Sequence, residues 1–300
     1  MQKNKCAIFI VGPTAVGKTK VSIDIAKKIN TEIISCDSRQ FYKELKIGSA
    51  PPSFQEQQEI RHHFIQHLSI KDDYNAGRFE IDAINKIKEL HKKYNKIILV
   101  GGSGLYIDAI CKGLDNIPKI SNEVRKIINL KYKENGIKWL QNEAMKIEPK
   151  IKEHPNFKNP QRLLRILEVF NQTGKRLSSF HTKKIKKRPF KTIKIGLKIS
   201  REDLYSKINN RVDVMIQNGL IDEVISLSNY KNKNALNTVG YKELFYFIKH
   251  KTTLEKTINE IKMNTRRFAK RQITWFKKDK EIQWFESHQT KEIIEFISKL

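Results

Sequence analysis

The sequence predicts an α/β protein in which a parallel β-sheet is flanked by helices and interrupted by an inserted helical subdomain. Short apolar runs alternate with amphipathic stretches, as expected for successive β-α-β units. A glycine-rich turn follows the first apolar run and leads into a helix. Between residues 117 and 189 the apolar runs give way to helical segments, which indicates the insertion.

The first third of the chain contains three expected strands that end in polar or glycine-rich turns. Residues 6–11 are apolar and rich in β-branched side chains, and the amphipathic stretch 18–29 follows as a helix. Residues 32–35 form a second strand, and a helix over 79–93 precedes a third strand over 96–100. Because open parallel sheets bind ligands at the carboxyl ends of their strands, we expect the site in these turns.

Prolines punctuate the helical segments between residues 117 and 189, where no convincing strand pattern occurs. They are Pro118, Pro149, Pro155 and Pro160. We therefore expect a core made of residues 1–116 and 190–300, with 117–189 as the inserted subdomain. The basic run 183–189 is interpreted as a solvated loop, with contact to a phosphate backbone as the alternative.

The pattern returns to the α/β core after the insertion. Residues 192–199 form an expected strand, and helices are expected over 202–218, 220–228 and 253–277. The last of these helices adds to the positive charge of the chain through Arg266, Arg267, Lys270 and Arg271.

The overall composition favours a globular protein that binds a polyanion. Hydrophobic residues make up 39% of the 300 residues, which suffices for a packed core. The net charge of +27 attracts nucleic acid, although a coding bias toward Lys, Ile and Asn accounts for part of it. The apolar run 6–11 is too short for a membrane anchor or signal peptide. Three cysteines without paired spacing indicate a reducing compartment, and we expect a cytoplasmic protein.

The strongest motif matches the eight-position phosphate loop and lies between an expected strand and an expected helix. Its residues are Gly12, Pro13, Thr14, Ala15, Val16, Gly17, Lys18 and Thr19. The glycines let backbone N–H groups converge on phosphate oxygens, Lys18 adds a positive charge, and Thr19 can ligate Mg²⁺. This context disfavours a chance glycine-rich turn and predicts a P-loop NTPase-like core. The motif leaves open whether the bound diphosphate belongs to ATP or to another ester.

Polar residues follow the second expected strand at the same edge of the sheet. Asp37 could complete a Mg²⁺ shell or act as a general base, while a turn cap made by Asp37 or Ser38 is the structural alternative. The amide of Gln40 could read a base edge. Phe41 and Tyr42 could stack on a base or belong to the core.

Two further segments carry groups suited to phosphate or RNA. The turn 101–106 offers exposed amides and the Ser103 hydroxyl, although a tight strand-to-helix turn would look similar. Residues 159–165 open a helix with an apolar face, so its polar residues are surface residues by periodicity, with a phosphate or RNA groove as the alternative. Arg211, in the helix after the last expected strand, is likewise interpreted as a surface cation, with a phosphate clamp as the alternative. The histidines at 62, 63 and 67 lack metal-ligand spacing.

Taken together and in order, these segments resemble the tRNA dimethylallyltransferases, also called tRNA isopentenyltransferases. The resemblance covers nearly the whole chain. It includes the segments 12–19, 35–42, 47–50, 101–106, 159–162 and 239–241, and ends with Arg266 and the segment 270–276. The chain departs from the family pattern at Pro51, where Lys is common, and at Arg61, where Pro is usual.

The resemblance implies transfer of a dimethylallyl group from dimethylallyl diphosphate to N6 of the adenosine just 3′ of a tRNA anticodon. The phosphate loop would then hold this donor with Mg²⁺ through Thr14, Lys18 and Thr19. Arg211 would neutralise the departing diphosphate, and Asp37 would take the proton from the attacking amine.

The resemblance also implies which residues meet the tRNA anticodon stem-loop. Ser103, where the family usually has Thr, would contact the target nucleotide. The other expected tRNA contacts are Asp37, Ser38, Arg39, Gln40, Arg125, Gln161, Arg162, Leu163, Leu164 and Arg165. A monomer is expected, since a single enzyme unit suffices.

Alternatives from other classes remain at this point. A related enzyme could prenylate free adenine nucleotides, although such a small acceptor needs no inserted subdomain. An ordinary P-loop kinase would move the γ-phosphate of ATP. A basic RNA-binding protein could use its phosphate loop as a nucleotide switch.

Overall fold

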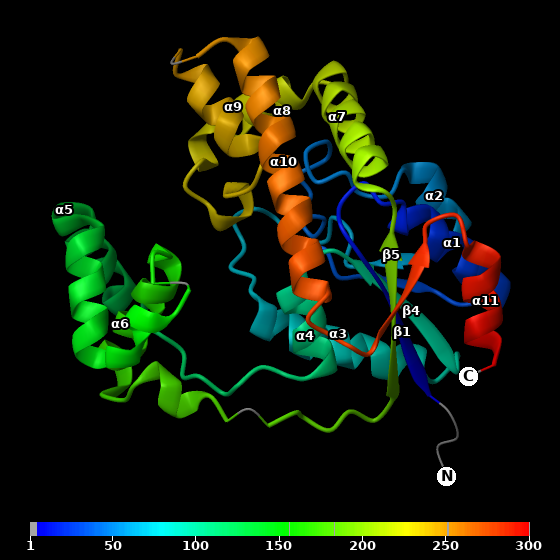
Figure 1. Cartoon of the computed structure of the whole chain (residues 1–300), viewed down its shortest axis with the longest axis horizontal. Coiled ribbons are helices and arrows are strands. Elements are labelled where there is room, and N and C mark those ends of the chain that lie inside the picture. The colour runs from blue at the N-terminus through cyan, green and yellow to red at the C-terminus, as the bar shows by residue number, and fades with distance from the viewer. Residues whose placement is uncertain (1–4, 156, 183, 251, 300) are drawn as a thin grey trace. The chain divides into compact units, whose positions relative to one another are not determined.

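The computed structural model describes residues 5–155, 157–182, 184–250 and 252–299. The chain divides into two compact units, one made of residues 1–111 and 187–300 and the other of residues 112–186 (Figure 1). The first unit is an α/β core, which confirms the predicted fold class. The expected subdomain boundaries at 117 and 189 stay a prediction, and Lys183 of the basic run lies outside the described residues.

A parallel sheet of six strands, counted over the described residues, forms the centre of the first unit. Its order is β3-β2-β4-β1-β5-β6. The strands are β1 (Cys6–Val11), β2 (Ile33–Ser35), β3 (His62–His63), β4 (Lys96–Gly101), β5 (Lys191–Lys198) and β6 (Ile282–Glu286). The central strand β1 pairs with β4 and β5 and is buried along its whole length, which explains its uninterrupted apolar sequence.

Helices cover both faces of the sheet. Alternate residues of β1 belong to two separate apolar clusters, because successive strand side chains point to opposite faces. α3 (Ala76–Leu90) and α4 (Gly104–Cys111) pack on one face, and α1 (Lys18–Ile29) and α11 (Thr290–Ser298) on the other (Figure 1). The remaining elements of this unit are α2 (Phe54–Glu59), α7 (Arg201–Gln217), α8 (Leu220–Ser226), η3 (Ser228–Tyr230), η4 (Asn234–Leu236), α9 (Tyr241–Ile248) and α10 (Leu254–Phe276).

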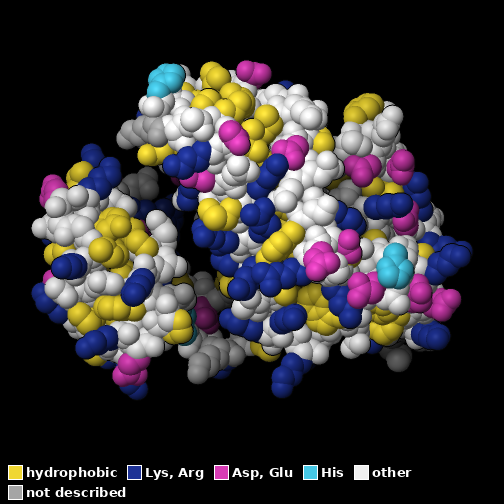
Figure 2. All heavy atoms as spheres, turned by 45° about the horizontal axis from the view of Figure 1, so that its top comes forward, with side chains coloured by type: hydrophobic (Ala, Val, Ile, Leu, Met, Phe, Trp, Pro, Cys, Tyr) yellow, Lys and Arg dark blue, Asp and Glu magenta, His cyan; other side chains and the backbone are white. Residues whose placement is uncertain are grey.

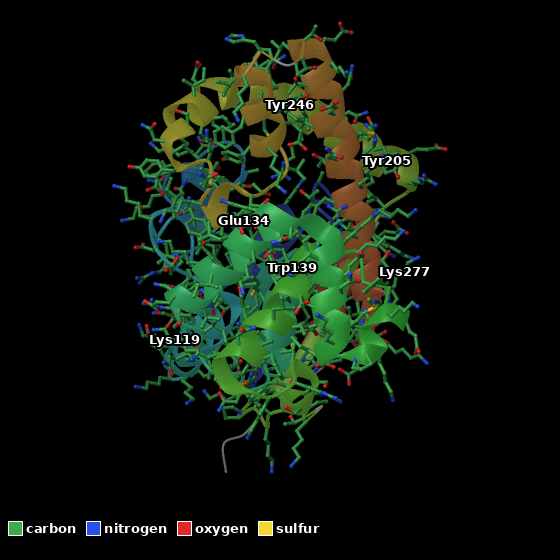
Figure 3. All side chains as sticks on the ribbon, turned by 90° about the vertical axis from the view of Figure 1, so that its left-hand side faces the viewer. Lys119, Glu134, Trp139, Tyr205, Tyr246 and Lys277 are labelled. Atoms are coloured by element: carbon green, nitrogen blue, oxygen red, sulfur yellow. The ribbon has the colours of Figure 1, made fainter. Side chains whose placement is uncertain are left out.

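The second unit is helical over its described residues. It contains α5 (Asn122–Ile147), η1 (Pro149–Glu153), α6 (Pro160–Thr173) and η2 (Leu177–Phe180). Asn159 caps α6, and Pro160 occupies its first turn, where no N–H donor is needed. Gly136, with a φ of 72°, kinks α5 between the positions of Glu134 and Trp139 labelled in Figure 3. A separate apolar cluster joins α5 to α6.

The local patterns predicted most elements, but two edge strands were missed. The bounds of β1 and α1 agree with the prediction, and β4 and β5 agree within one residue. β3 has two residues and β6 lies among charged residues, so neither carries a strong strand pattern. Among the described helices, none is long and apolar enough to cross a membrane.

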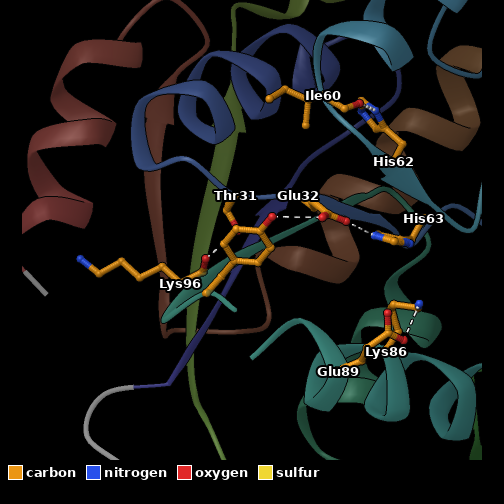
Figure 4. A network of polar contacts seen from close by, with 9 residues as sticks. Thr31, Glu32, Ile60, His62, His63, Lys86, Glu89 and Lys96 are labelled. Carbon is orange, nitrogen blue, oxygen red and sulfur yellow. Dashed lines mark hydrogen bonds and ion pairs between the residues drawn. The ribbon is translucent and has the colours of Figure 1, made fainter. Parts of the chain in front are cut away.

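A polar network fastens the amino end of the sheet, opposite the phosphate loop (Figure 4). The ring of His63 lies 2.6 Å from Glu32 Oε2, and the Tyr94 hydroxyl donates to Glu32 Oε1 at 3.1 Å. The Thr31 hydroxyl donates to the carbonyl of Lys96 at 2.8 Å. Burial lowers the pKa of His63 although Glu32 opposes this shift. These bonds tie the starts of β2 and β4 to the edge strand β3.

Candidate active site at the carboxyl ends of the strands

The phosphate loop joins β1 to α1 and requires glycine at two positions. Gly12 has a φ of 149°, and a Cβ there would lie 2.8 Å from the carbonyl oxygen of Leu197. Gly17 has a φ of 99° at the start of α1 and offers no side-chain cap. The first N–H groups of α1 therefore stay available for an anion.

Lys18 is held inside this loop in the free protein. Its Nζ donates to the carbonyl of Pro13 at 2.7 Å. Burial lowers the pKa of Lys18 to about 8, Asp37 opposes this shift, and Arg211 adds to it. A bound anion would place a further negative charge beside this ammonium group and stabilise its charged form.

Arg211 reaches the same loop from α7, so it is not a purely surface cation. Its guanidinium lies 3.4 Å from Thr14 Oγ1 and 3.5 Å from the carbonyl of Ala50. Burial lowers the pKa of Arg211, and Asp37 opposes the shift. The structure thus brings Thr14, Lys18, Asp37 and Arg211 together, although they are far apart in the sequence.

Two cavities meet at this edge of the sheet. One, of about 380 Å³, is lined by phosphate-loop residues that include Lys18 and Thr19. The other, of about 470 Å³, is lined by Ser103 and by the aromatic residues Tyr106 and Trp275. The residues common to both are Thr14, Asp37, Ser49, Arg211, Phe268 and Gln272.

Asp37 lies at the junction of these cavities and also caps its own turn. Its Oδ1 accepts a hydrogen bond from the backbone N–H of Arg39 at 3.0 Å. Within the described residues no hydrogen bond reaches its Oδ2. One oxygen therefore holds the turn, as the structural alternative expected, and the other is free to act on a ligand.

The turns after β2 and β4 are joined by serine hydroxyls. Ser103 Oγ accepts from the backbone N–H of Ser38 at 3.0 Å and donates to Ser38 Oγ at 3.1 Å. This places the Ser103 hydroxyl beside Asp37, on the wall of the larger cavity.

Other predicted residues of this segment bind neighbouring parts of the protein. The amide of Gln40 accepts from Ser35 Oγ at 3.1 Å and donates to the carbonyl of Ala50 at 2.9 Å. The Arg39 guanidinium donates to the carbonyls of Asn234, Ala235 and Asn237. Phe41 and Tyr42 are buried in the core, which rules out base stacking by either ring. This segment therefore shapes the cavity wall through its side chains.

One face of α10 lines the site with residues to which the sequence analysis assigned no role. Phe268, Gln272 and Trp275 occur at helical spacing and line the larger cavity. Trp275 is not a core residue, because 42% of its surface is exposed. Its indole N–H donates to Asp108 at 3.0 Å. The spacing of four and three residues along one helix, together with the family resemblance over 270–276, could have revealed this face.

The residues expected to meet tRNA in the second unit differ in exposure. Gln161 and Arg125 are exposed, whereas Arg162 and Arg165 are half-buried. Arg165 lies 3.5 Å from Glu168. Leu163 and Leu164 are buried in the core of this unit, so they support the helix from within.

Basic side chains are spread over the face drawn in Figure 2, where acidic side chains are sparser. In the first unit, Tyr205 of α7 lies beside α10 (Figure 3). The guanidinium groups of Arg201 and Arg266 lie 5.2 and 5.7 Å from its ring. Cations and an aromatic ring of this kind suit a nucleic-acid surface.

Comparison with curated proteins finds close relatives along the whole chain. Residues 40–279 match the family model described as IPP transferase. The tRNA dimethylallyltransferase of Christiangramia forsetii is 54% identical over 291 residues, which cover 97% of this chain and 96% of the relative. That of Flavobacterium psychrophilum is 50% identical over 298 residues, with 97% of each chain covered.

Solved structures agree with these relatives. The tRNA isopentenylpyrophosphate transferase of Bacillus halodurans matches with a TM-score of 0.72 and 33% identity, covering 98% of this chain and 96% of that chain. A eukaryotic dimethylallyltransferase acting on tRNA matches with a TM-score of 0.77 and 27% identity, covering 94% of this chain and 74% of that chain. The motifs, the fold and these similarities agree that the chain belongs to the IPP transferase family.

Proposed function

We propose that this chain transfers the dimethylallyl group of dimethylallyl diphosphate to N6 of the adenosine just 3′ of a tRNA anticodon, releasing diphosphate. The position of Asp37 carries the proposal. This carboxylate lines both cavities, one with the cations Lys18 and Arg211 and the other with the aromatic rings of Tyr106 and Trp275. An anionic donor suits the first cavity, and an adenine suits the second.

The chemistry of the reaction needs groups of these kinds. The exocyclic amine of adenine is a poor nucleophile, because its lone pair is delocalised into the ring. As the bond from nitrogen to the allylic carbon forms, the carbon–oxygen bond breaks and its electron pair leaves with the diphosphate. Asp37 accepts the proton of the amine, while Lys18 and Arg211 stabilise the charge that develops on the leaving group.

The residues of the phosphate loop fit a Mg²⁺ ion that is shared with the substrate. The Thr19 hydroxyl is a hard oxygen ligand and makes no hydrogen bond within the described residues. The described part of the chain contains no cluster of three or more His, Cys, Asp or Glu residues that could hold a metal. Mg²⁺ commonly takes one or two protein ligands and completes its shell with phosphate oxygens and water. Such an ion would add positive charge beside the diphosphate.

The acceptor must leave its stack to reach the larger cavity. A base inside a folded anticodon loop cannot reach Asp37 unless it is extruded, and aromatic side chains compensate for the lost stacking. The net charge of +27 favours binding of the tRNA backbone. In the second unit Arg125, Gln161, Arg162 and Arg165 are the proposed contacts. A monomeric cytoplasmic enzyme is part of this proposal.

The direct test supplies labelled dimethylallyl diphosphate and Mg²⁺ with either unmodified tRNA or AMP. We expect label on an adenosine of the tRNA and none on AMP. Label on AMP alone would replace the tRNA assignment with a nucleotide prenyltransferase. Consumption of ATP with phosphoryl transfer would instead indicate a kinase.

Replacing the proposed base should remove turnover and spare binding. In Asp37→Asn the amide oxygen can still accept from the Arg39 N–H, so the turn is retained. We expect single-turnover prenylation to fall by about 10² to 10⁴-fold, the range for loss of a general base, with tRNA affinity within a few-fold. The exposed Asp73→Asn is the matched control. Full activity in Asp37→Asn would exclude it as the base.

Removing the arginines of α6 should reduce the salt dependence of tRNA binding. Arg162→Ala with Arg165→Ala removes up to two phosphate contacts, so the slope of log K against log salt should fall by about 0.7 to 0.9 per contact. Filter binding from low to moderate salt measures this slope. Lys92→Ala with Lys93→Ala, exposed at the amino end of the sheet, should leave it unchanged. An unchanged slope in the α6 variant would argue against contact there.

Donor affinity should depend on pH through Lys18. Its pKa of about 8 in the free protein must rise when a diphosphate binds, so binding requires the protonated amine. Affinity for inorganic pyrophosphate should therefore be full below pH 8 and fall as the pH rises above it. Calorimetry across this range measures the effect. Lys18→Arg should flatten the profile because arginine stays charged, while the exposed Lys20→Arg should not.

A further inference from the structure

The side chain of Gln272 connects two loops that the proposed reaction must align. It comes from α10 and is only 6% exposed. Its Oε1 accepts from the backbone N–H of Thr14 at 2.9 Å, and its Nε2 donates to the carbonyl of Gly102 at 2.9 Å. One buried amide thus binds the phosphate loop at one end and the turn after β4 at the other.

The hydrogen bonds allow the amide only one orientation. A flipped side chain would set its NH₂ against the Thr14 N–H and its oxygen against the Gly102 carbonyl. A Cβ at Gly102 would lie 2.2 Å from Gln272 Nε2, so glycine is what permits this approach. α10 touches the same turn again through Trp275, whose ring lies 2.4 Å from a Cβ built at Gly104.

Each end of this bridge carries a residue of the candidate site. The phosphate loop presents Lys18 to the donor, and the turn after β4 presents Ser103 beside Asp37. Transfer requires the allylic carbon to approach the amine to about 3 to 3.5 Å, so a displacement of about 1 Å between the two loops is costly to the rate. Both hydrogen bonds of Gln272 resist such a displacement.

We propose that Gln272 is a positioning residue that fixes the spacing between the donor loop and the acceptor turn and transmits donor occupancy to α10. The inference rests on the function proposed above. The Thr14 N–H belongs to the loop whose N–H groups are suited to phosphate. A diphosphate seated there acts on the bond from Thr14 to Gln272, and thereby on the Trp275 side chain three residues further along α10.

Kinetics separate positioning from binding. Gln272→Met keeps the length of the side chain without its hydrogen bonds, and Gln272→Asn keeps the amide but is too short to reach both loops. We expect kcat to fall about 10- to 100-fold in both, with pyrophosphate and tRNA affinities within about threefold of the starting protein. Gln289→Met is the matched control, because its Oε1 also accepts a backbone N–H, from Glu286, outside both cavities. It should keep its kcat.

Trp275 fluorescence tests the connection without any turnover. Pyrophosphate should change the emission of the unaltered protein, and Trp275→Phe should remove this change. In Gln272→Met, pyrophosphate should still bind by calorimetry, but the change in emission should be lost. If the unaltered protein fails to prenylate tRNA, the proposed function is wrong. The fluorescence measurement still tests whether Gln272 couples the phosphate loop to Trp275, because it needs no turnover.

A substitution at Gly102 tests the contact of Gln272 with the turn after β4. Gly102→Ala should push the Gln272 amide aside and lower kcat to a similar extent. In the double variant, Gln272→Met with Gly102→Ala, kcat should be no more than about threefold lower than in either single variant. Unchanged kcat and emission in Gln272→Met would overturn the proposal. So would recovery of activity in Gln272→Asn, or a loss of both affinities in parallel with kcat.

Discussion

Neighbouring parallel strands that end at one edge of the sheet impose the geometry of the whole site. The end of β1 lies opposite Gly101 at the end of β4, and the end of β2 lies opposite Val100. The phosphate loop, the Asp37 turn and the turn bearing Ser103 therefore leave the sheet side by side. The register of the backbone brings them to one edge, and side-chain contacts such as those of Gln272 act within this arrangement.

Burial gives this edge its electrostatic character. Lys18 and Arg211 are held where desolvation lowers their pKa, and Asp37 compensates them only in part. Cations that lack a full set of counter-charges favour an anionic ligand, because the ligand replaces the solvation that they have lost. The same arrangement works against a neutral ligand. The charge of the cavity therefore favours an anionic ligand.

The sequence predicted those parts of the site that depend on local order along the chain. The phosphate loop and α1 follow from a contiguous pattern, and Asp37 follows from its place after a strand. The roles of Gln272 and Phe268 could not be predicted in this way, because the parts of the site that they contact are far away in the sequence. Arg39 shows a long-range contact that local order also does not predict. The resemblance placed it among the tRNA contacts, which stays a prediction, while the structure shows its guanidinium bonded to three backbone carbonyls of the protein.

Both cavities of the candidate site belong to the first unit. Every residue that lines the two cavities lies outside 112–186. Arg188, at the start of the returning segment, donates to the carbonyls of Ile110 and Ala109 at the end of α4 and pairs with Glu80 at 2.8 Å. These bonds join the chain on either side of residues 112–186 within the first unit. Arg188 thereby joins the returning segment to both α3 and α4, the two helices on one face of the sheet.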